Sequence, residues 1–169
     1  MTHKKKVLCV RDIIIFGIFS ALMIISQVAL SFLPNIELVS FLVMLYVSVY
    51  GMRSLWAIYV FVAVEGVLYP FGLWWISYLY IWTLLAVASY IFRSAQSPLV
   101  WAIISGTFGL LFGALCAIPY IFIGGFAMAF SYWVNGIAFD LPHCIGNFII
   151  ALVLMNPAKK LIMKLDNKS

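Results

Sequence analysis

Long apolar runs, separated only by short polar stretches, are the sequence feature that most limits how this chain can fold. Hydrophobic residues make up 66% of its 169 residues and charged residues only 9%. Soluble domains are about half apolar and about a quarter charged, and a water-soluble fold of this length could not bury so much apolar surface. The sequence therefore predicts an all-α integral membrane protein with a single membrane domain over residues 1–169.

The polar stretches divide the chain into segments close to the length that a bilayer requires. A transmembrane helix needs about 20 apolar residues, within a range of roughly 17–25. The first run follows a basic start but is too long for a signal peptide, so it is counted as a span. We predict six transmembrane helices, with the longest connection over residues 119–139. Their ranges are 12–33, 36–50, 54–69, 75–92, 98–120 and 140–157.

The positions of the basic residues predict the orientation of these helices. With six spans, every Lys and Arg falls on one face, whereas five or seven spans would scatter them over both. The positive-inside rule makes that face cytoplasmic, so both termini are predicted to be cytoplasmic in a plasma-membrane protein. Because these cations are dispersed beside the membrane, lipid head groups explain them better than nucleic acid does. They are Lys4, Lys5, Lys6, Arg11, Arg53, Arg93, Lys159, Lys160, Lys164 and Lys168.

Acids, amides and aromatic residues collect on the opposite, outer face, which has no Lys or Arg in this topology. Glu65 lies about 6 Å inside the outer end of its predicted helix, where a carboxylate costs a few kcal/mol unless it is paired, protonated or hydrated. Asp140, His143 and Asn147 fall within about 60° of one another on a helix and should face the protein interior. The sequence therefore predicts an outer polar cavity. Its predicted residues are Asn35, Glu65, Tyr69, Trp74, Trp75, Tyr78, Asp140, His143 and Asn147.

Structural alternatives remain for several of these residues. Asn35 and Glu37 could serve only to cap and to complement the start of a helix. Asp140 could be an N-cap, and the tryptophans and tyrosines could form an ordinary interfacial belt. The stripe of Asp140 and its neighbours could also be a structural polar network without a cavity.

Two small-residue patterns indicate close helix packing. Ala102, Gly106, Gly109, Gly113 and Ala117 form a stripe along one predicted helix, for which we favour an intramolecular contact. A second pair, Gly17 and Ala21, lies on the first helix and could contact either this chain or a second membrane protein.

Motifs for several kinds of chemistry are missing from the sequence. The three cysteines form no C-x-x-C pair and lie near no plausible set of metal ligands, so we predict no disulfide, metal or cofactor. There is no P-loop, no H-E-x-x-H and no G-x-S-x-G. The chain is therefore not predicted to be an enzyme.

The chain as a whole resembles the S-components of energy-coupling factor (ECF) transporters, the membrane subunits that capture vitamins and related micronutrients. The resemblance lies in RDIIIFGIFSALM, FLPNIEL, YPFGLWWISYLY, FDLPHCIGNFIIALVL and the later Lys-Lys pair. It implies a substrate site at the outer side, in the region of Glu65, Trp74, Trp75, Tyr78, Asp140, His143 and Asn147. It also implies a transmembrane coupling subunit and two ATPase subunits as partners. Gly17 and Ala21 would match the surface that meets the coupling subunit, although the family usually has alanine at the first position.

The predicted site favours some ligands over others. Aromatic faces suit flat heterocycles or cations, and carboxylates suit N–H donors. The lack of Arg and Lys disfavours ligands held through carboxylate or phosphate groups. We therefore expect a neutral or cationic heterocycle, such as a pyrimidine, a deazapurine or a thiamine-like compound. The alternatives are a self-contained secondary transporter, an intramembrane enzyme and a tryptophan-rich tetrapyrrole-binding protein.

Overall fold

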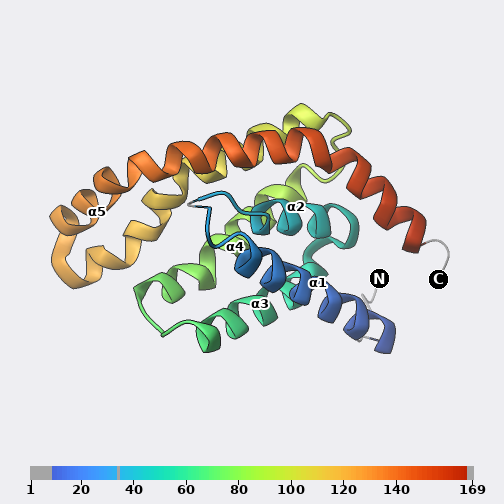
Figure 1. Cartoon of the computed structure of the whole chain (residues 1–169), viewed down its shortest axis with the longest axis horizontal. Coiled ribbons are helices and arrows are strands. Elements are labelled where there is room, and N and C mark those ends of the chain that lie inside the picture. Colours follow the sequence, from blue (N-terminus) through green and yellow to red (C-terminus); the bar gives the residue numbers. More distant parts are fainter. Residues whose placement is uncertain (1–8, 34, 167–169) are drawn as a thin grey trace, which may run out of the picture.

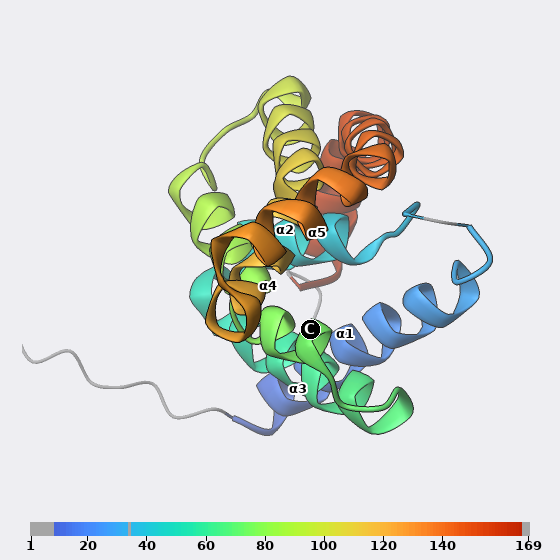
Figure 2. The same ribbon diagram turned by 90° about the vertical axis from the view of Figure 1, so that its left-hand side faces the viewer.

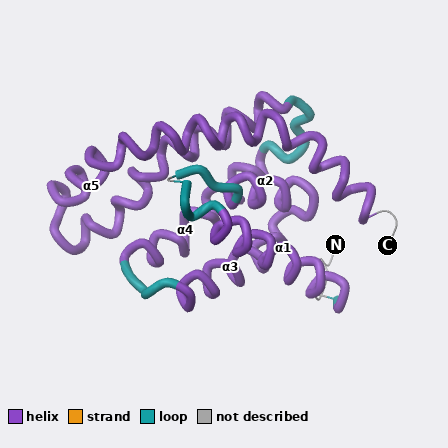
Figure 3. Tube along the Cα trace, in the orientation of Figure 1, coloured by secondary structure: helices purple, strands orange, loops and turns teal. Residues whose placement is uncertain are grey.

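A computed structural model describes residues 9–33 and 35–166, which form helices joined by short loops, with no strand in these ranges (Figures 1 and 3). The elements are α1 (Val10–Ala29), α2 (Val39–Tyr50), the short 3-10 helix η1 (Gly51–Ser54), α3 (Leu55–Leu68), α4 (Leu73–Ile91) and α5 (Pro98–Asp166). The predicted all-α class is therefore confirmed for the described residues.

Four helical segments of the described chain are long and apolar enough to cross a membrane. They are Val10–Ala29, Val39–Leu68, Leu73–Ile91 and Pro98–Asp166. The second segment combines α2, η1 and α3, and the fourth is the whole of α5. The length and composition of these segments are those of a multi-pass membrane protein.

The chain reverses direction inside two of these segments, and a glycine with positive φ lies at each reversal. Gly51 follows α2 with φ 64°, and Gly125 interrupts α5 with φ 76°. Glycine adopts such angles without the steric penalty of a Cβ atom. Figure 1 shows the consequence: successive helical runs travel back and forth along the long axis, and α5 folds back on itself as two antiparallel arms.

The predicted loop over residues 119–139 is wrong, because α5 is helical on both sides of Gly125 from Pro98 to Asp166. Pro119 and Pro142 lie inside the helix instead of ending it. In an apolar environment every backbone N–H and C=O needs a partner, so a helix continues through proline where a loop would leave these groups unpaired. The predicted ranges 98–120 and 140–157 lie within the two arms of α5.

The helices pack in three layers, seen end-on in Figure 2. The two arms of α5 form one layer, α2 and α4 lie in the middle, and α1 and α3 form the third. The small-residue stripe is buried between the arms of α5. A Cβ on Gly109 would lie 2.8 Å from the backbone oxygen of His143, and one on Gly106 would lie 3.2 Å from Cβ of Phe148. The predicted intramolecular contact is therefore confirmed.

Basic residues from α1, η1, α5 and the loop after α4 meet at one end of the bundle. Arg11, in the first turn of α1, pairs with Asp166 at 2.8 Å, and Arg53 in η1 pairs with Asp12. Lys159 Nζ donates to the backbone oxygen of Arg93 at 3.1 Å. The ends of α4 and α5 therefore lie close to the start of α1 and to η1.

Candidate functional site

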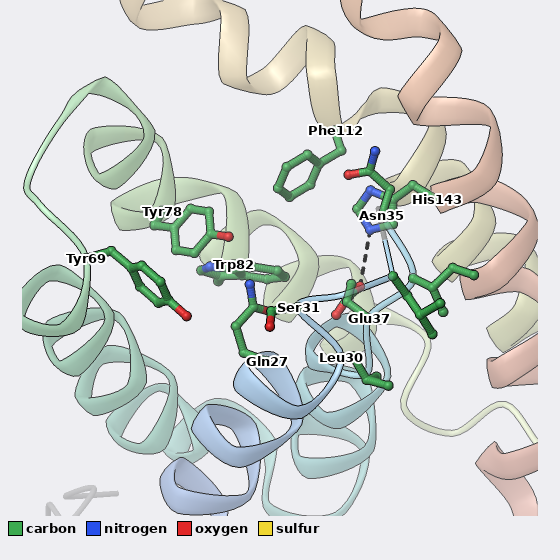
Figure 4. Close-up of a pocket in the computed structure, with 12 residues that line it drawn as sticks. Gln27, Leu30, Ser31, Asn35, Glu37, Tyr69, Tyr78, Trp82, Phe112 and His143 are labelled. Carbon is green, nitrogen blue, oxygen red and sulfur yellow. Dashed lines mark hydrogen bonds and ion pairs between the residues drawn. The ribbon is translucent and has the colours of Figure 1, made fainter.

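A cavity of about 310 Å³ lies away from this basic end, near the starts of α2 and α4 (Figure 4). Its walls come from the end of α1, the α1–α2 loop, the residue after α3, α4 and both arms of α5. The lining residues are Gln27, Leu30, Ser31, Leu33, Asn35, Ile36, Glu37, Tyr69, Tyr78, Trp82, Phe112 and His143. None of them is Lys or Arg.

A carboxylate–imidazole pair closes one side of this cavity. Glu37 Oε1 lies 3.2 Å from His143 Nε2, and Glu37 Oε2 accepts a hydrogen bond from the Ser40 backbone N–H at 2.8 Å. Burial by itself raises the pKa of Glu37, but the hydrogen bonds from His143 and Ser40 outweigh it and hold the pKa below its usual value. Glu37 therefore contacts the start of α2, but the same side chain also faces the cavity, so its role is not confined to the helix start.

Asn35 lies in the α1–α2 loop, beside this pair. Its backbone has φ 56°, a left-handed conformation in which Asn is enriched several-fold among residues other than glycine. The Asn35 side chain lines the cavity beside His143 in Figure 4.

Aromatic rings form the opposite wall. Trp74, Tyr78 and Trp82 recur every four residues along α4, so they share one face of the helix. Neighbouring rings meet edge to face at centroid distances of 5.2 and 5.3 Å. Phe112, from the first arm of α5, meets the His143 ring edge to face at 4.8 Å. A flat ligand would therefore have aromatic surfaces on α4 and α5 to contact.

Two buried nitrogen atoms in the cavity walls have no hydrogen-bond partner among the described residues. They are His143 Nδ1 and Trp82 Nε1, on side chains that are 3% and 2% exposed. A carboxylate only accepts hydrogen bonds, so Nε2 of His143 donates to Glu37, while Nδ1 accepts a hydrogen bond in the neutral ring and donates one in the protonated ring. The walls thus hold two buried nitrogen atoms without a described partner, of which the Trp82 indole N–H is a donor.

A second cavity of about 600 Å³ adjoins the first and shares Asn35 and Phe112 with it. Asp140 lines this cavity, and its Oδ1 accepts a hydrogen bond from the Gly113 backbone N–H at 3.0 Å. The N-cap alternative for Asp140 is wrong, because Asp140 lies inside α5 and bonds to the other arm. The remaining lining residues are Cys116, Tyr132, Asn135, Gly136 and Phe139.

The structure brings five of the nine predicted site residues to these two cavities. Asn35, Tyr69, Tyr78 and His143 line the first, and Asp140, with Asn35, lines the second. The predicted inward stripe is buried: Asp140, His143 and Asn147 are 5%, 3% and 2% exposed.

The other four predicted residues line neither cavity. Asn147 and Glu65 are each 2% exposed, and Asn147 Nδ2 and Glu65 Oε1 have no partner among the described residues. Trp74 donates its indole N–H to the Pro70 backbone oxygen, and Trp75 donates to that of Val62. These two tryptophans support the α3–α4 connection and the aromatic wall.

Sequence reasoning missed eight of the twelve residues that line the first cavity. They are Gln27, Leu30, Ser31, Leu33, Ile36, Glu37, Trp82 and Phe112. Trp82 could have been found, because it continues the four-residue spacing of Trp74 and Tyr78. Nothing local marks Phe112 or Gln27, since an isolated Phe or Gln in an apolar run has many other roles.

Comparison with known proteins finds no matching family model, no matching curated protein and no matching solved structure. Within residues 9–33 and 35–166, no group of three or more His, Cys, Asp or Glu side chains is arranged to hold a metal ion. Fold and cavity together define a helical protein with the features of a multi-pass membrane protein and an internal site of small-molecule size.

Proposed function

We propose that this protein is the substrate-capture subunit of an ECF-type importer and binds a heterocyclic micronutrient at the extracellular side of the plasma membrane. The observation that carries the proposal is the first cavity. It combines the Glu37–His143 pair with the rings of Tyr78, Trp82 and Phe112, and no Lys or Arg lines it. Few placed polar groups among aromatic walls are typical of small-molecule sites.

The volume and chemistry of the cavity support a ligand of one or two rings. About 310 Å³ is near the lower end of the range for ligand sites, roughly 300–1,000 Å³. Tyr78, Trp82 and Phe112 offer ring contacts, while His143 Nδ1 and Trp82 Nε1 are polar atoms without a partner among the described residues. A neutral or cationic heterocycle meets these groups without bringing a second negative charge toward Glu37.

The proposed topology has six membrane passages, formed by α1, α2, α3, α4 and the two arms of α5. The basic end, with Arg11, Arg53 and Arg93, faces the cytoplasm under the positive-inside rule. The cavity then opens toward the outside, since Glu37 precedes α2 while Arg53 follows it, about 20 Å further along a helix at 1.5 Å per residue.

The exposed face of α1 supports a partner surface for the coupling subunit. Gly17 and Ala21 are both exposed, and a Cβ on Gly17 would meet nothing within 4 Å. Small residues on an exposed membrane helix let another helix approach closely. In this proposal two ATPase subunits supply the energy for transport, and the protein itself catalyses no reaction.

Equilibrium dialysis of the purified protein against a panel of vitamins and related heterocycles tests the ligand site. We expect a neutral or cationic heterocycle to bind, and Tyr78→Ala to weaken its binding about tenfold or more through the lost ring contact. Tyr90→Ala, the same change at the basic end of α4, is the control and should leave affinity unchanged. Binding of polyanionic ligands alone would contradict the proposed site.

Co-purification separates the proposed importer subunit from a secondary transporter. An S-component should associate with a coupling subunit and ATPases, and uptake should stop when an ATP-binding residue of those ATPases is mutated. Uptake driven by an ion gradient in vesicles without ATPases would instead identify a self-contained transporter.

A further inference from the structure

The cavity beside Asp140 is lined by a buried carboxyl group with one unpartnered oxygen. Asp140 is 5% exposed, its Oδ1 accepts the Gly113 N–H, and its Oδ2 has no partner among the described residues. The ion pairs of the described chain join Arg11 to Asp166, Arg53 to Asp12 and His143 to Glu37, so none of them includes Asp140. A buried carboxylate without a cation is costly, and a ligand cation would remove that cost.

The rest of this cavity also suits a cation. Phe112, Tyr132 and Phe139 bring aromatic rings to its wall, and aromatic faces attract ammonium groups. Asn35 and Asn135 bring amide oxygens, which accept hydrogen bonds from N–H donors. None of the lining residues is Lys or Arg, so the ligand would have to bring any positive charge.

The two cavities are neighbours with different chemistry. Asn35 and Phe112 belong to both walls. In the first cavity Glu37 is hydrogen-bonded to His143, whereas in the second Asp140 forms no salt bridge with any described residue. One molecule that extends past Asn35 and Phe112 would present its ring to the first cavity and its other end to Asp140.

We infer that the ligand carries a cationic nitrogen, of the ammonium or amidinium class, which occupies the Asp140 cavity while the attached ring lies between Tyr78, Trp82 and Phe112. This inference rests on the proposed function, because it requires that the first cavity binds a small molecule. It goes further in choosing the cationic class over the neutral one and in assigning the second cavity as the subsite for the charge.

The test uses three ring systems, phenyl, indolyl and pyrimidinyl, each as the ethylamine, the acetamide and the acetate. Members of a set share a ring and a chain of similar length but end in an ammonium, a neutral amide or a carboxylate. Affinities are measured by isothermal titration on the purified full chain. In at least one ring system we expect the ammonium form to bind about tenfold or more tighter than the amide, as a charge-assisted hydrogen bond implies.

Asp140→Asn is the central variant, since its amide oxygen can still accept the Gly113 N–H while its charge is lost. We expect it to reduce the ratio of ammonium to amide affinity to about one. Asp166→Asn removes the same charge at the opposite end of the bundle and should leave the ratio as in the wild type. If Asp140→Asn does not fold, Tyr132→Leu replaces it, because Tyr132 lines the same cavity and is 40% exposed.

The possible outcomes distinguish failure of the cationic subsite from failure of the proposed ligand site in the first cavity. If the ring compounds bind without preference for the ammonium form, the cationic subsite is overturned and the first cavity remains the proposed ligand site. The same conclusion follows if a preference for the ammonium form persists in Asp140→Asn or Tyr132→Leu. If no ring compound and no member of the vitamin panel binds, both the ligand site in the first cavity and the cationic subsite are overturned. A cation preference lost in Asp140→Asn and kept in Asp166→Asn supports both.

Discussion

Glu37 and His143 lie 106 residues apart in the chain, and their Oε1 and Nε2 atoms are 3.2 Å apart. The contact ties the α1–α2 loop to the second arm of α5. Since Glu37 also accepts the Ser40 N–H, one carboxylate joins the loop, the start of α2 and α5. The pair therefore contributes both to the shape and to the polarity of one wall of the first cavity.

A double-mutant cycle of Glu37→Gln and His143→Gln measures this coupling. Each single change should lower the free energy of unfolding by roughly 1–3 kcal/mol, because it leaves a buried polar group poorly paired. The double variant should lose less than the sum, with a coupling of about 0.5–3 kcal/mol. Unfolding of the detergent-solubilised protein followed by circular dichroism gives these values. Additivity within about 0.5 kcal/mol would show that the two side chains do not interact.

The lowered pKa of Glu37 predicts a pH dependence of stability. A glutamate in the unfolded chain has a pKa of about 4.3, so its ionised form stabilises the folded state above that pH. This contribution is lost as the pH falls from about 4.3 through the lower pKa of the folded state. Between pH 5 and 3 the wild type should lose more unfolding free energy than Glu37→Gln. Equal losses of unfolding free energy between pH 5 and 3 in the two proteins would contradict the pairing of Glu37 with His143.

Gly109→Ala should destabilise the α5 hairpin. The added Cβ would lie within 2.9 Å of the backbone of His143 and Cys144, which cannot move away as a side-chain tip can. Overpacking of this kind costs roughly 1–3 kcal/mol. Gly136→Ala on the same helix is the control, because nothing lies within 4 Å of its Cβ. We expect Gly109→Ala, but not Gly136→Ala, to lower the melting temperature. Equal melting temperatures for the two variants would rule out the close contact of Gly109 with the second arm of α5.

Trp82→Phe should separate ligand recognition from stability. The variant keeps a ring in the wall but removes a buried N–H that has no partner among the described residues. The free protein should therefore be as stable as the wild type or more so, since an unsatisfied donor is gone. Affinity for the ligand of the first cavity should fall, by up to about tenfold if the N–H donates to it. Unchanged affinity in dialysis would exclude Trp82 Nε1 as a ligand contact.

Cysteine labelling tests the proposed orientation. In a variant whose three cysteines are replaced by alanine, Ser31→Cys lies in the α1–α2 loop and Ser94→Cys lies in the α4–α5 loop beside Arg93. Both serines are exposed. A membrane-impermeant maleimide should label intact cells at position 31 but label position 94 only after permeabilisation. The reverse pattern would invert the topology and place the cavity on the cytoplasmic side.

Several parts of the site could be predicted because they depend on local pattern. The spacing of Asp140, His143 and Asn147 puts them on one helix face, and a polar stripe in an apolar helix turns inward wherever the helix packs. The stripe through Gly106, Gly109 and Gly113 likewise indicated a close contact. The residue that each stripe meets could not be predicted, because that depends on how neighbouring helices rotate and slide against one another.

For Glu65 the sequence predicted burial but not the surface that the side chain faces. Its depth in an apolar segment indicated burial, and the side chain is 2% exposed. A helix turns 100° per residue, however, so burial alone leaves open which interior surface a side chain faces. In the folded chain Glu65 lines neither cavity, while Glu37, which the local pattern explained as a helix-start residue, reaches His143.

Apolar run length was enough to predict a helical chain with segments long enough to cross a membrane. The placement of Lys and Arg was enough to separate a cationic end from a polar, aromatic end. Both properties depend on residues close in the chain. Tertiary packing alone decided that residues 119–139 continue as helix around Gly125, that Glu37 pairs with His143, and that Asp140 faces a second cavity. The reason is that these features depend on the register between helices, which is set by the fit of side chains from distant parts of the chain.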